Sequence, residues 1–196
     1  GDFIYLTQNL DVEYINMSYI QIHPTVEPDY GVHISEAVRG NGGILIDETG
    51  KRFVNELELK DSLSKKLIAL PSKTAYLFFD DKVRNSTKEV ESYIADKIVF
   101  SANSIEGLAA QLFVDADILK NTINDYNNAV KVNFDSEFHR QNLDNAIEGR
   151  NYYAIKVWPG VYYCIGGLPV NENAQVLSKD NTPIQGLYAA GEATGG

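Results

Sequence analysis

The chain has 196 residues, of which 44% are hydrophobic and 22% are charged, which fits one globular domain or one domain plus part of another. Its net charge of −10 argues against nucleic acid as a partner, because phosphate binding needs clustered Lys and Arg. No apolar run approaches the roughly 20 residues of a membrane helix, and the single cysteine, Cys164, excludes an internal disulfide and fits a reducing compartment.

Short helices and strands are predicted to follow one another through most of the chain. After a turn-prone start over residues 1–17 they are, in chain order, a strand at 19–22, a helix at 35–38, strands at 44–46 and 52–54, a helix at 63–70, a strand at 74–79, a helix at 87–95, a strand at 98–100, and helices at 104–112 and from 115 onward. We expect Pro24 to end the first strand and Pro71 to stop the helix before it. Asn103 and Glu106 have the spacing of a capping box.

The helix from Asp115 is amphipathic, because its apolar residues recur along one face. These residues are Leu119, Ile123, Tyr126 and Val130. The aromatic run of Tyr76, Phe78 and Phe79 is predicted to be core. The tail instead holds short strands and glycine-rich turns at 162–167, 175–177 and 186–192. Helices and strands mix without a regular βαβ order, so the predicted fold class is α+β.

Side chains able to do chemistry concentrate between residues 21 and 61. Three motifs follow one another there, Gln-Ile-His-Pro-Thr at 21–25, Ser-Glu-Ala-Val-Arg-Gly-Asn-Gly-Gly at 35–43 and Gly-Lys-Arg-Phe-Val-Asn-Glu at 50–56. They combine an imidazole, a carboxylate and cations with glycines that allow close backbone approach. Such a group can hold an anionic small molecule and pass it a proton.

In this order and spacing, the motifs resemble the flavoprotein subunit of fumarate reductases, in particular the soluble flavocytochrome type. They are more loosely similar to succinate dehydrogenase and L-aspartate oxidase flavoproteins. The segment 186–196 resembles the family's second FAD-contacting strand and turn, and residues 104–140 resemble its mobile cap. The resemblance implies FAD as cofactor. The implied FAD-contacting residues are Gly166, Gly167, Gly191, Glu192 and Thr194. No metal ligand set is implied.

The Gly-x-Gly-x-x-Gly turn with which the family begins is absent from this sequence. The resemblance therefore implies a piece of a longer flavoprotein, with flavin-domain remnants at 1–17 and 162–196 and a substrate-capping domain at 18–161. We expect such a piece to bind FAD weakly or not at all and to be inactive alone. Its implied partners are a small carboxylate substrate, the missing flavin-domain halves and an electron-donor domain or subunit, with no nucleic acid and no membrane span.

The family's site residues can be carried over to matching positions. His23 and Ser35 would bind one substrate carboxylate, while Glu36 and Arg39 would relay a proton. Their i,i+3 spacing puts Glu36 and Arg39 on one face of a helix. Read without the family, this pair could be only an exposed ion pair, and His23 only a residue at a strand end. Arg52 is predicted to be structural and to pair with Glu56, and His33 and His139 to be surface residues.

Two departures from the family bear on the reaction. The expected proton donor is an arginine before an aspartate, and Lys60 stands there before Asp61. Lysine donates a proton more readily but lacks the planar fork that grips a carboxylate. Tyr162 and Tyr163 replace a histidine pair that would help to bind the second carboxylate. An unsaturated monocarboxylate, cinnamate-like or urocanate-like, is therefore an alternative to fumarate.

Two other functions stay open on the sequence. A dehydrogenase of the 3-ketosteroid type shares the cap-plus-FAD layout, but it acts on neutral substrates, which the charged motifs disfavour. A non-catalytic domain that keeps the fold is the other, and the changes at Lys60 and Tyr162 favour it.

Overall fold

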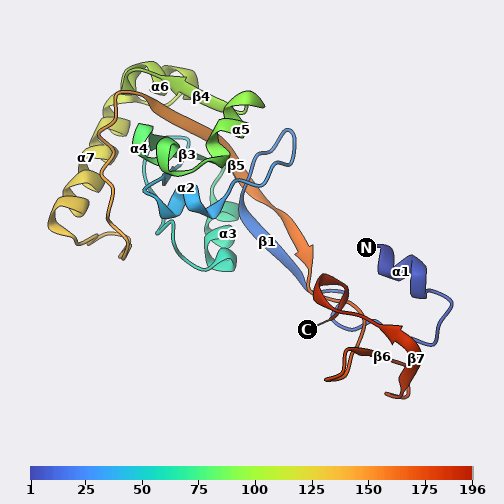
Figure 1. Cartoon of the computed structure of the whole chain (residues 1–196). Helices are drawn as coiled ribbons and strands as arrows, with labels where there is room; N and C mark the ends of the chain where they lie inside the picture. Colours follow the sequence, from blue (N-terminus) through green and yellow to red (C-terminus); the bar gives the residue numbers. More distant parts are fainter. Residues whose placement is uncertain (196) are drawn as a thin grey trace. The chain divides into compact units, whose positions relative to one another are not determined.

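The computed structural model describes residues 1–195. The chain forms two compact units, a central unit of residues 23–160 and a terminal unit of residues 1–22 with the residues from 161 onward (Figure 1).

The central unit is built on a five-stranded sheet of order β1-β5-β3-β2, in which β4 also pairs with β5. Its strands are β2 Ile44–Ile46, β3 Ala75–Asp80, β4 Val99–Ala102 and most of β1 Ile20–Val26 and β5 Tyr152–Cys164, whose residues 20–22 and 161–164 belong to the terminal unit. The pairs β2–β3, β3–β5 and β4–β5 are antiparallel, with Leu77 opposite both Leu45 and Ile155. Helices surround the sheet: α2 Glu36–Gly40, α3 Lys60–Ala69, α4 Asp81–Ser86, α5 Glu89–Ala95, α6 Ile105–Leu112 and α7 Ala116–Val132. The predicted α+β class is confirmed.

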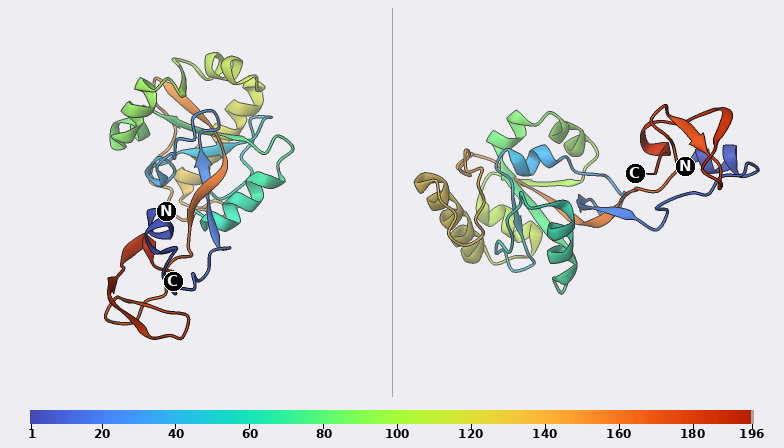
Figure 2. Two further views of the ribbon diagram at one scale, coloured as in Figure 1. Left: turned by 90° about the vertical axis from the view of Figure 1, so that its right-hand side faces the viewer. Right: turned by 90° about the horizontal axis from the view of Figure 1, so that it is seen from below.

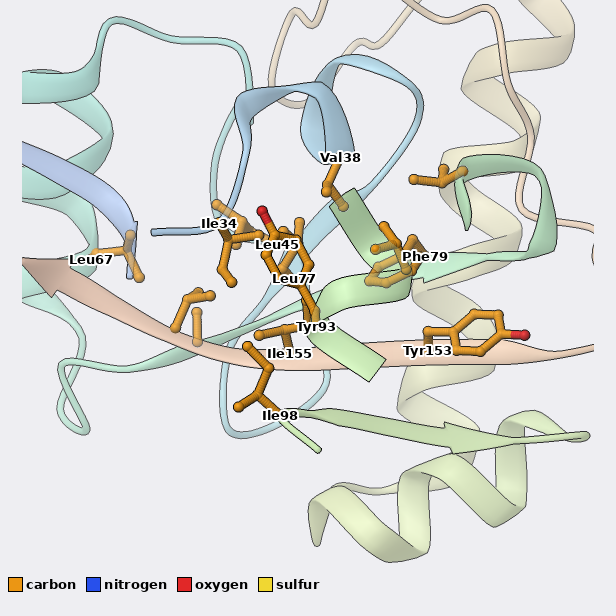
Figure 3. Packing of buried hydrophobic residues seen from close by; sticks show 14 of the residues in the cluster. Ile34, Val38, Leu45, Leu67, Leu77, Phe79, Tyr93, Ile98, Tyr153 and Ile155 are labelled. Carbon is orange, nitrogen blue, oxygen red and sulfur yellow. The ribbon is translucent and has the colours of Figure 1, made fainter. Parts of the chain in front are cut away.

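Successive side chains of a strand point to opposite faces of the sheet, so each face packs into a hydrophobic core of its own. Leu77 and Phe79 of β3 join one core with Ile155 of β5, against residues of α2, α3 and α5 (Figure 3). Phe78, between them in sequence, joins the other core with residues of α6 and α7. Phe78 and Phe79 are fully buried and Tyr76 is partly buried, so the predicted core role of this run is confirmed.

Helix α7 has the predicted form. The Asp115 carboxylate caps it by accepting from the Asp117 and Ile118 amides at 2.9 and 3.0 Å. Leu119, Ile123 and Tyr126 are buried. Helix α6 begins differently from the prediction, because its cap is Ser104 and not Asn103. The Ser104 Oγ accepts from the Gly107 amide at 3.0 Å.

Three strand predictions were wrong. β1 does not end at Pro24 but continues to Val26, which is possible because β1 lies at the sheet edge, where a missing N–H breaks no ladder. Residues 52–54 form no strand, since only Arg52 bridges to Ile46. Residues 162–164 are the end of the 13-residue strand β5, not the start of a new one.

The terminal unit contains α1 Asp2–Thr7, a helix that the sequence analysis did not predict, and the antiparallel strands β6 Gln175–Leu177 and β7 Pro183–Tyr188, orange-red in Figure 2. A short 3-10 helix, η1 Gly191–Ala193, follows. The small hydrophobic core of the terminal unit contains Val12, Leu168 and Val176. Within residues 1–195, none of the helices has the length and apolar character needed to cross a membrane.

Candidate active site

Helix α2 presents the second motif. The Ser35 hydroxyl accepts a hydrogen bond from the Ala37 amide at 3.3 Å, so the predicted cap is confirmed. Gly43 ends the helix tightly: its amide bonds the Val38 carbonyl at 2.9 Å, and a Cβ there would lie 2.7 Å from that oxygen. Glu36 is exposed in the first turn and Arg39, one turn later, is buried. A short, sharply ended helix therefore carries an outer carboxylate and an inner guanidinium.

The first residue of α3 meets this helix. Lys60 Nζ lies 2.7 Å from Glu36 Oε1, with 29% and 53% of the two side chains exposed. The hydrogen bond from Lys60 lowers the pKa of Glu36, and the charge of Arg39 lowers it further. Lys60 and Glu36 thus form an ion pair at the boundary with solvent.

The imidazole of His23 completes the cluster from β1. It is 4% exposed, and the ring of His33 lies 5.2 Å from it in an edge contact. Burial lowers its pKa to about 4, helped by the charges of Arg39, His33 and Lys60 and opposed by Glu36. His23 is therefore neutral at pH 7. Its Nδ1 lies 3.2 Å from both the amide and the carbonyl oxygen of Thr25, so it can accept from the first in one tautomer or donate to the second in the other.

Arg39 is unusual among the buried cations. It is 3% exposed, and its Nη1 donates to the Glu56 carbonyl at 2.5 Å. Its Nε and Nη2 are buried with no hydrogen-bond partner within the described part of the chain. Burial lowers its pKa, while the carboxylates of Glu36 and Glu56 oppose that shift. Buried donors usually have a hydrogen-bond partner, so these two donors distinguish Arg39 from the other buried arginines of residues 1–195.

A buried ion cluster lies behind Arg39. The Glu56 carboxylate is fully buried and accepts from Arg52 at 2.9 and 3.0 Å and from Arg140 at 3.1 Å. Arg52 also bonds Asp135 at 3.0 Å and lies over the rings of Tyr126 and Phe138. The predicted pairing of Arg52 with Glu56 is confirmed. The pairing of Arg140 with Glu56 was not predicted, because the two residues are 84 positions apart and no local sequence pattern indicates such a contact.

The two other histidines differ from each other. His139 is exposed, as predicted. His33 is exposed too, but its ring contacts His23, so it belongs beside the cluster rather than on an unrelated surface.

The remaining predicted site residues lie in the terminal unit, where they divide into two groups. A pocket of about 550 Å³ is lined by Tyr162, Tyr163, Cys164, Ile165, Gly191, Glu192 and Thr194. Gly166 and Gly167 instead serve chain packing. A Cβ on Gly166 would lie 2.4 Å from the Asn16 carbonyl carbon, and one on Gly167 would lie 2.4 Å from the Ala193 oxygen. Among residues 1–195, His, Cys, Asp and Glu side chains form no cluster able to hold a metal.

Known proteins share this sequence and fold. The family described as an FAD binding domain matches residues 1–196. The chain is 41% identical over its whole length to a fumarate reductase (cytochrome) of Shewanella frigidimarina and covers 34% of that protein. It is 41% identical to an NADH:fumarate oxidoreductase of Klebsiella pneumoniae (strain 342) and covers 21% of it.

A solved structure agrees with these matches. The open conformation of a flavocytochrome c3 fumarate reductase superposes with a TM-score of 0.80 at 33% identity, over 100% of this chain and 35% of that one. The chain thus spans about a third or less of the length of these relatives. It belongs to the FAD-binding domain family and, within it, to the fumarate reductase flavoproteins.

Proposed function

We propose that the chain supplies the substrate-capping and proton-delivering part of an FAD-dependent reductase of α,β-unsaturated carboxylates, of the fumarate-to-succinate type. The observation that carries the proposal is the contact of 2.7 Å between Lys60 Nζ and Glu36 Oε1. Glu36 lies in the first turn of α2, and the next turn of the same helix places Arg39 in the interior. The ammonium of Lys60, the carboxylate of Glu36 and the guanidinium of Arg39, in that order, are groups that can form a proton relay.

Saturating the double bond needs a hydride at the β-carbon and a proton at the α-carbon. FAD, when bound and reduced, supplies the hydride. In the proposal, the Lys60 ammonium gives its proton to the α-carbon as the electron pair of the double bond moves there. Glu36, which is a carboxylate in the ion pair, then accepts a proton from Arg39 and passes it to the neutral Lys60 amine, and Arg39 is reprotonated from solvent.

His23 and Ser35 are suited to hold one substrate carboxylate. In the tautomer whose Nδ1 accepts from the Thr25 amide, the neutral imidazole can donate a hydrogen bond from Nε2 without adding a second acid to the site. The Ser35 oxygen already accepts from the Ala37 amide at 3.3 Å, which leaves its own O–H as a donor. Both groups polarise the bound enoate by stabilising charge on its carboxylate.

The terminal-unit pocket fits one edge of a flat heteroaromatic group such as a flavin ring. Tyr162 and Tyr163, whose ring centroids are 5.2 Å apart, also line this pocket, and we assign them to the substrate beside the flavin. Gly191 has a φ of +69°, and nothing lies within 4 Å of the place where its Cβ would be, so its backbone is open to a ligand. Glu192 and Thr194 would add polar contacts. Gly166 and Gly167 stay among the proposed FAD-contacting residues, and close packing against the chain itself also requires a glycine at both positions.

The proposal also includes the remaining partners, namely the other parts of the flavin domain and an electron donor. Several large apolar side chains of the terminal unit are exposed, with Tyr5 75%, Leu6 79% and Tyr19 60% accessible. Exposed apolar groups of this size are typical of a surface that another protein segment covers. We expect the 196-residue chain alone to bind FAD weakly and to be inactive.

An unsaturated monocarboxylate is the second candidate substrate class. Tyr162 and Tyr163 line their pocket with hydroxyls and rings but with no positive charge, so they suit an aromatic or uncharged end of the substrate. The charged pair of Lys60 and Glu36 disfavours the neutral substrates of ketosteroid dehydrogenases.

The test is oxidation of a reduced dye by the full-length flavoprotein that contains this chain, with fumarate, acrylate, cinnamate and urocanate as acceptors. We expect turnover with at least one enoate, and a loss of about 10²-fold or more in kcat for Lys60→Met. Turnover by Lys60→Met equal to wild type would refute the assigned acid. Absence of turnover with every enoate would favour a non-catalytic domain. Fumarate as the best substrate by kcat/KM would exclude the monocarboxylate alternative.

A further inference from the structure

The C-terminal end of α2 is held by side chains from a loop about a hundred residues later in the chain. Arg140 Nη2 donates to the Arg39 carbonyl at 2.7 Å, and Nη1 donates to the Gly43 carbonyl at 2.9 Å. Asn142 Nδ2 bonds the Gly40 carbonyl at 3.1 Å. The last carbonyls of a helix have no partner within the helix, so the bonds to the Arg39 and Gly40 carbonyls replace its missing continuation, and the bond to the Gly43 carbonyl holds the chain just beyond α2.

Arg140 can hold this part of the chain in place because almost all of its guanidinium donors make hydrogen bonds. It is 2% exposed, and its four donated bonds also include the Asn142 carbonyl at 2.9 Å and Glu56 Oε2 at 3.1 Å. A buried arginine with this many partners has a single available orientation. Whatever Arg140 holds is therefore fixed.

Glu56 completes the arrangement from the other side. Its carboxylate accepts from Arg140 Nη1, and its carbonyl accepts from Arg39 Nη1 at 2.5 Å. The backbone of Arg39 is thus tied to Arg140, and its side chain is tied to Glu56. Because Glu56 and Arg140 are themselves bonded, the backbone and the guanidinium of Arg39 share one rigid support. We call Glu56 and Arg140 the α2 clasp.

We propose that the α2 clasp positions Arg39 for proton delivery, with Arg140 and Glu56 as positioning residues that touch no substrate. The inference rests on the proposed function, because it assigns support to the relay of Lys60, Glu36 and Arg39. Arg39 has no side-chain hydrogen bond within the described residues other than the one to Glu56, and its Nε and Nη2 stay unmatched. Displacing α2 by about 1 Å would misalign the relay, and misplacement on that scale can reduce a rate about 100-fold.

The decisive variant is Arg140→Lys, with Arg52→Lys as its matched control. Lysine keeps the charge beside Glu56 but cannot span the Arg39, Gly43 and Asn142 carbonyls at once. Arg52 belongs to the same buried ion cluster and bonds the same carboxylate at 2.9 Å, but none of its hydrogen bonds reaches α2. The control therefore reproduces the loss of cluster stability without the loss of the clasp.

Two readouts are needed, both at a temperature well below the Tm of each variant. In the full-length flavoprotein, we expect Arg140→Lys to lower kcat about 10- to 100-fold with KM changed less than about 3-fold, and Arg52→Lys to stay within about 3-fold of wild type in both. The solvent deuterium isotope effect on kcat should rise for Arg140→Lys alone. In the 196-residue chain, ¹⁵N NMR should show faster hydrogen exchange of the Arg39 Nε–H in Arg140→Lys only.

Equal losses of kcat in the two variants would mean that the clasp merely stabilises the fold, and would overturn the proposal. A loss confined to KM, or unchanged kcat in folded Arg140→Lys, would overturn it as well. The NMR arm separates this failure from failure of the proposed function, because it reports on Arg39 without any turnover. Unchanged exchange at Arg39 refutes the clasp even in an active enzyme, and changed exchange supports it even if no enoate is reduced.

Discussion

Lys60 and Glu36 come from the first turns of two different helices, and Lys60 Nζ reaches Glu36 Oε1 at 2.7 Å. An exposed pair of this kind adds at most about 1 kcal/mol to stability. The pair therefore contributes little to stability, and we assign it to proton transfer between the two groups. In the proposed relay, the pair links Lys60 at the solvent boundary to the buried Arg39, which gives the first prediction.

Glu36→Gln should lower kcat of the full-length flavoprotein about 100-fold while changing the Tm little. The amide keeps the shape of the side chain but cannot carry the proton from Arg39 to Lys60. Glu106→Gln is the matched control, because Glu106 forms an ion pair of the same length, 2.7 Å, with Lys120 on helices away from α2. Steady-state kinetics of both variants decide the matter, and equal activity of the two would contradict the relay.

Ser35→Ala should raise KM for the enoate and also reduce the free energy of unfolding by about 1 kcal/mol, the usual effect of losing an N-cap. Ser104→Ala is a cap of the same kind on α6, with its Oγ 3.0 Å from the Gly107 amide. It should cause the same loss of stability and leave KM unchanged. Urea unfolding and substrate titration separate the two effects, and a KM unchanged by Ser35→Ala would restrict Ser35 to capping.

His23 should make the protein less stable in mild acid. Its pKa of about 4 in the folded chain lies below the ordinary 6.5, so the unfolded chain binds this proton first as the pH falls. The stability that the neutral ring contributes is complete above pH 6.5 and is lost as the pH falls toward 4. The full shift corresponds to about 3 kcal/mol, and we expect about 2 because solvent screens the neighbouring cations.

The measurement is the free energy of unfolding from urea titrations of wild type and His23→Gln at pH 7, 5.5 and 4. The difference between the two proteins should shrink toward acid pH. His139→Gln, a change at an exposed residue, is the control and should run parallel to wild type. A constant gap between wild type and His23→Gln would show that His23 is not neutral through burial.

Gly43→Ala should destabilise the chain by about 1–3 kcal/mol, the range for overpacking, because the new methyl would lie 2.7 Å from the Val38 carbonyl oxygen. Gly40→Ala, at the last residue of α2, meets nothing within 4 Å and should be neutral or slightly stabilising. Thermal unfolding of the two variants tests the pair. Equal Tm values would mean that the end of α2 can relax.

How far the site could be predicted from the sequence depends on the distance between contacting residues. The Ser35 cap and the Arg52–Glu56 pair follow from residues two to four positions apart, and both were predicted. Arg140 was missed because its partners Gly43 and Arg39 lie 97 and 101 positions away. The strand break at Pro24 was predicted wrongly because only the sheet order tells that β1 is an edge.

The sequence by itself indicated most of the helices, the Ser35 and Asp115 caps and the family, since these features depend on neighbouring residues. The tertiary structure decided which of these side chains carry charge and which are held still. His23 became neutral, Arg39 lost solvent, and Arg140 reached α2 only because segments distant in the chain pack together. Desolvation and long-range hydrogen bonds are properties of that packing, and no short stretch of sequence encodes them.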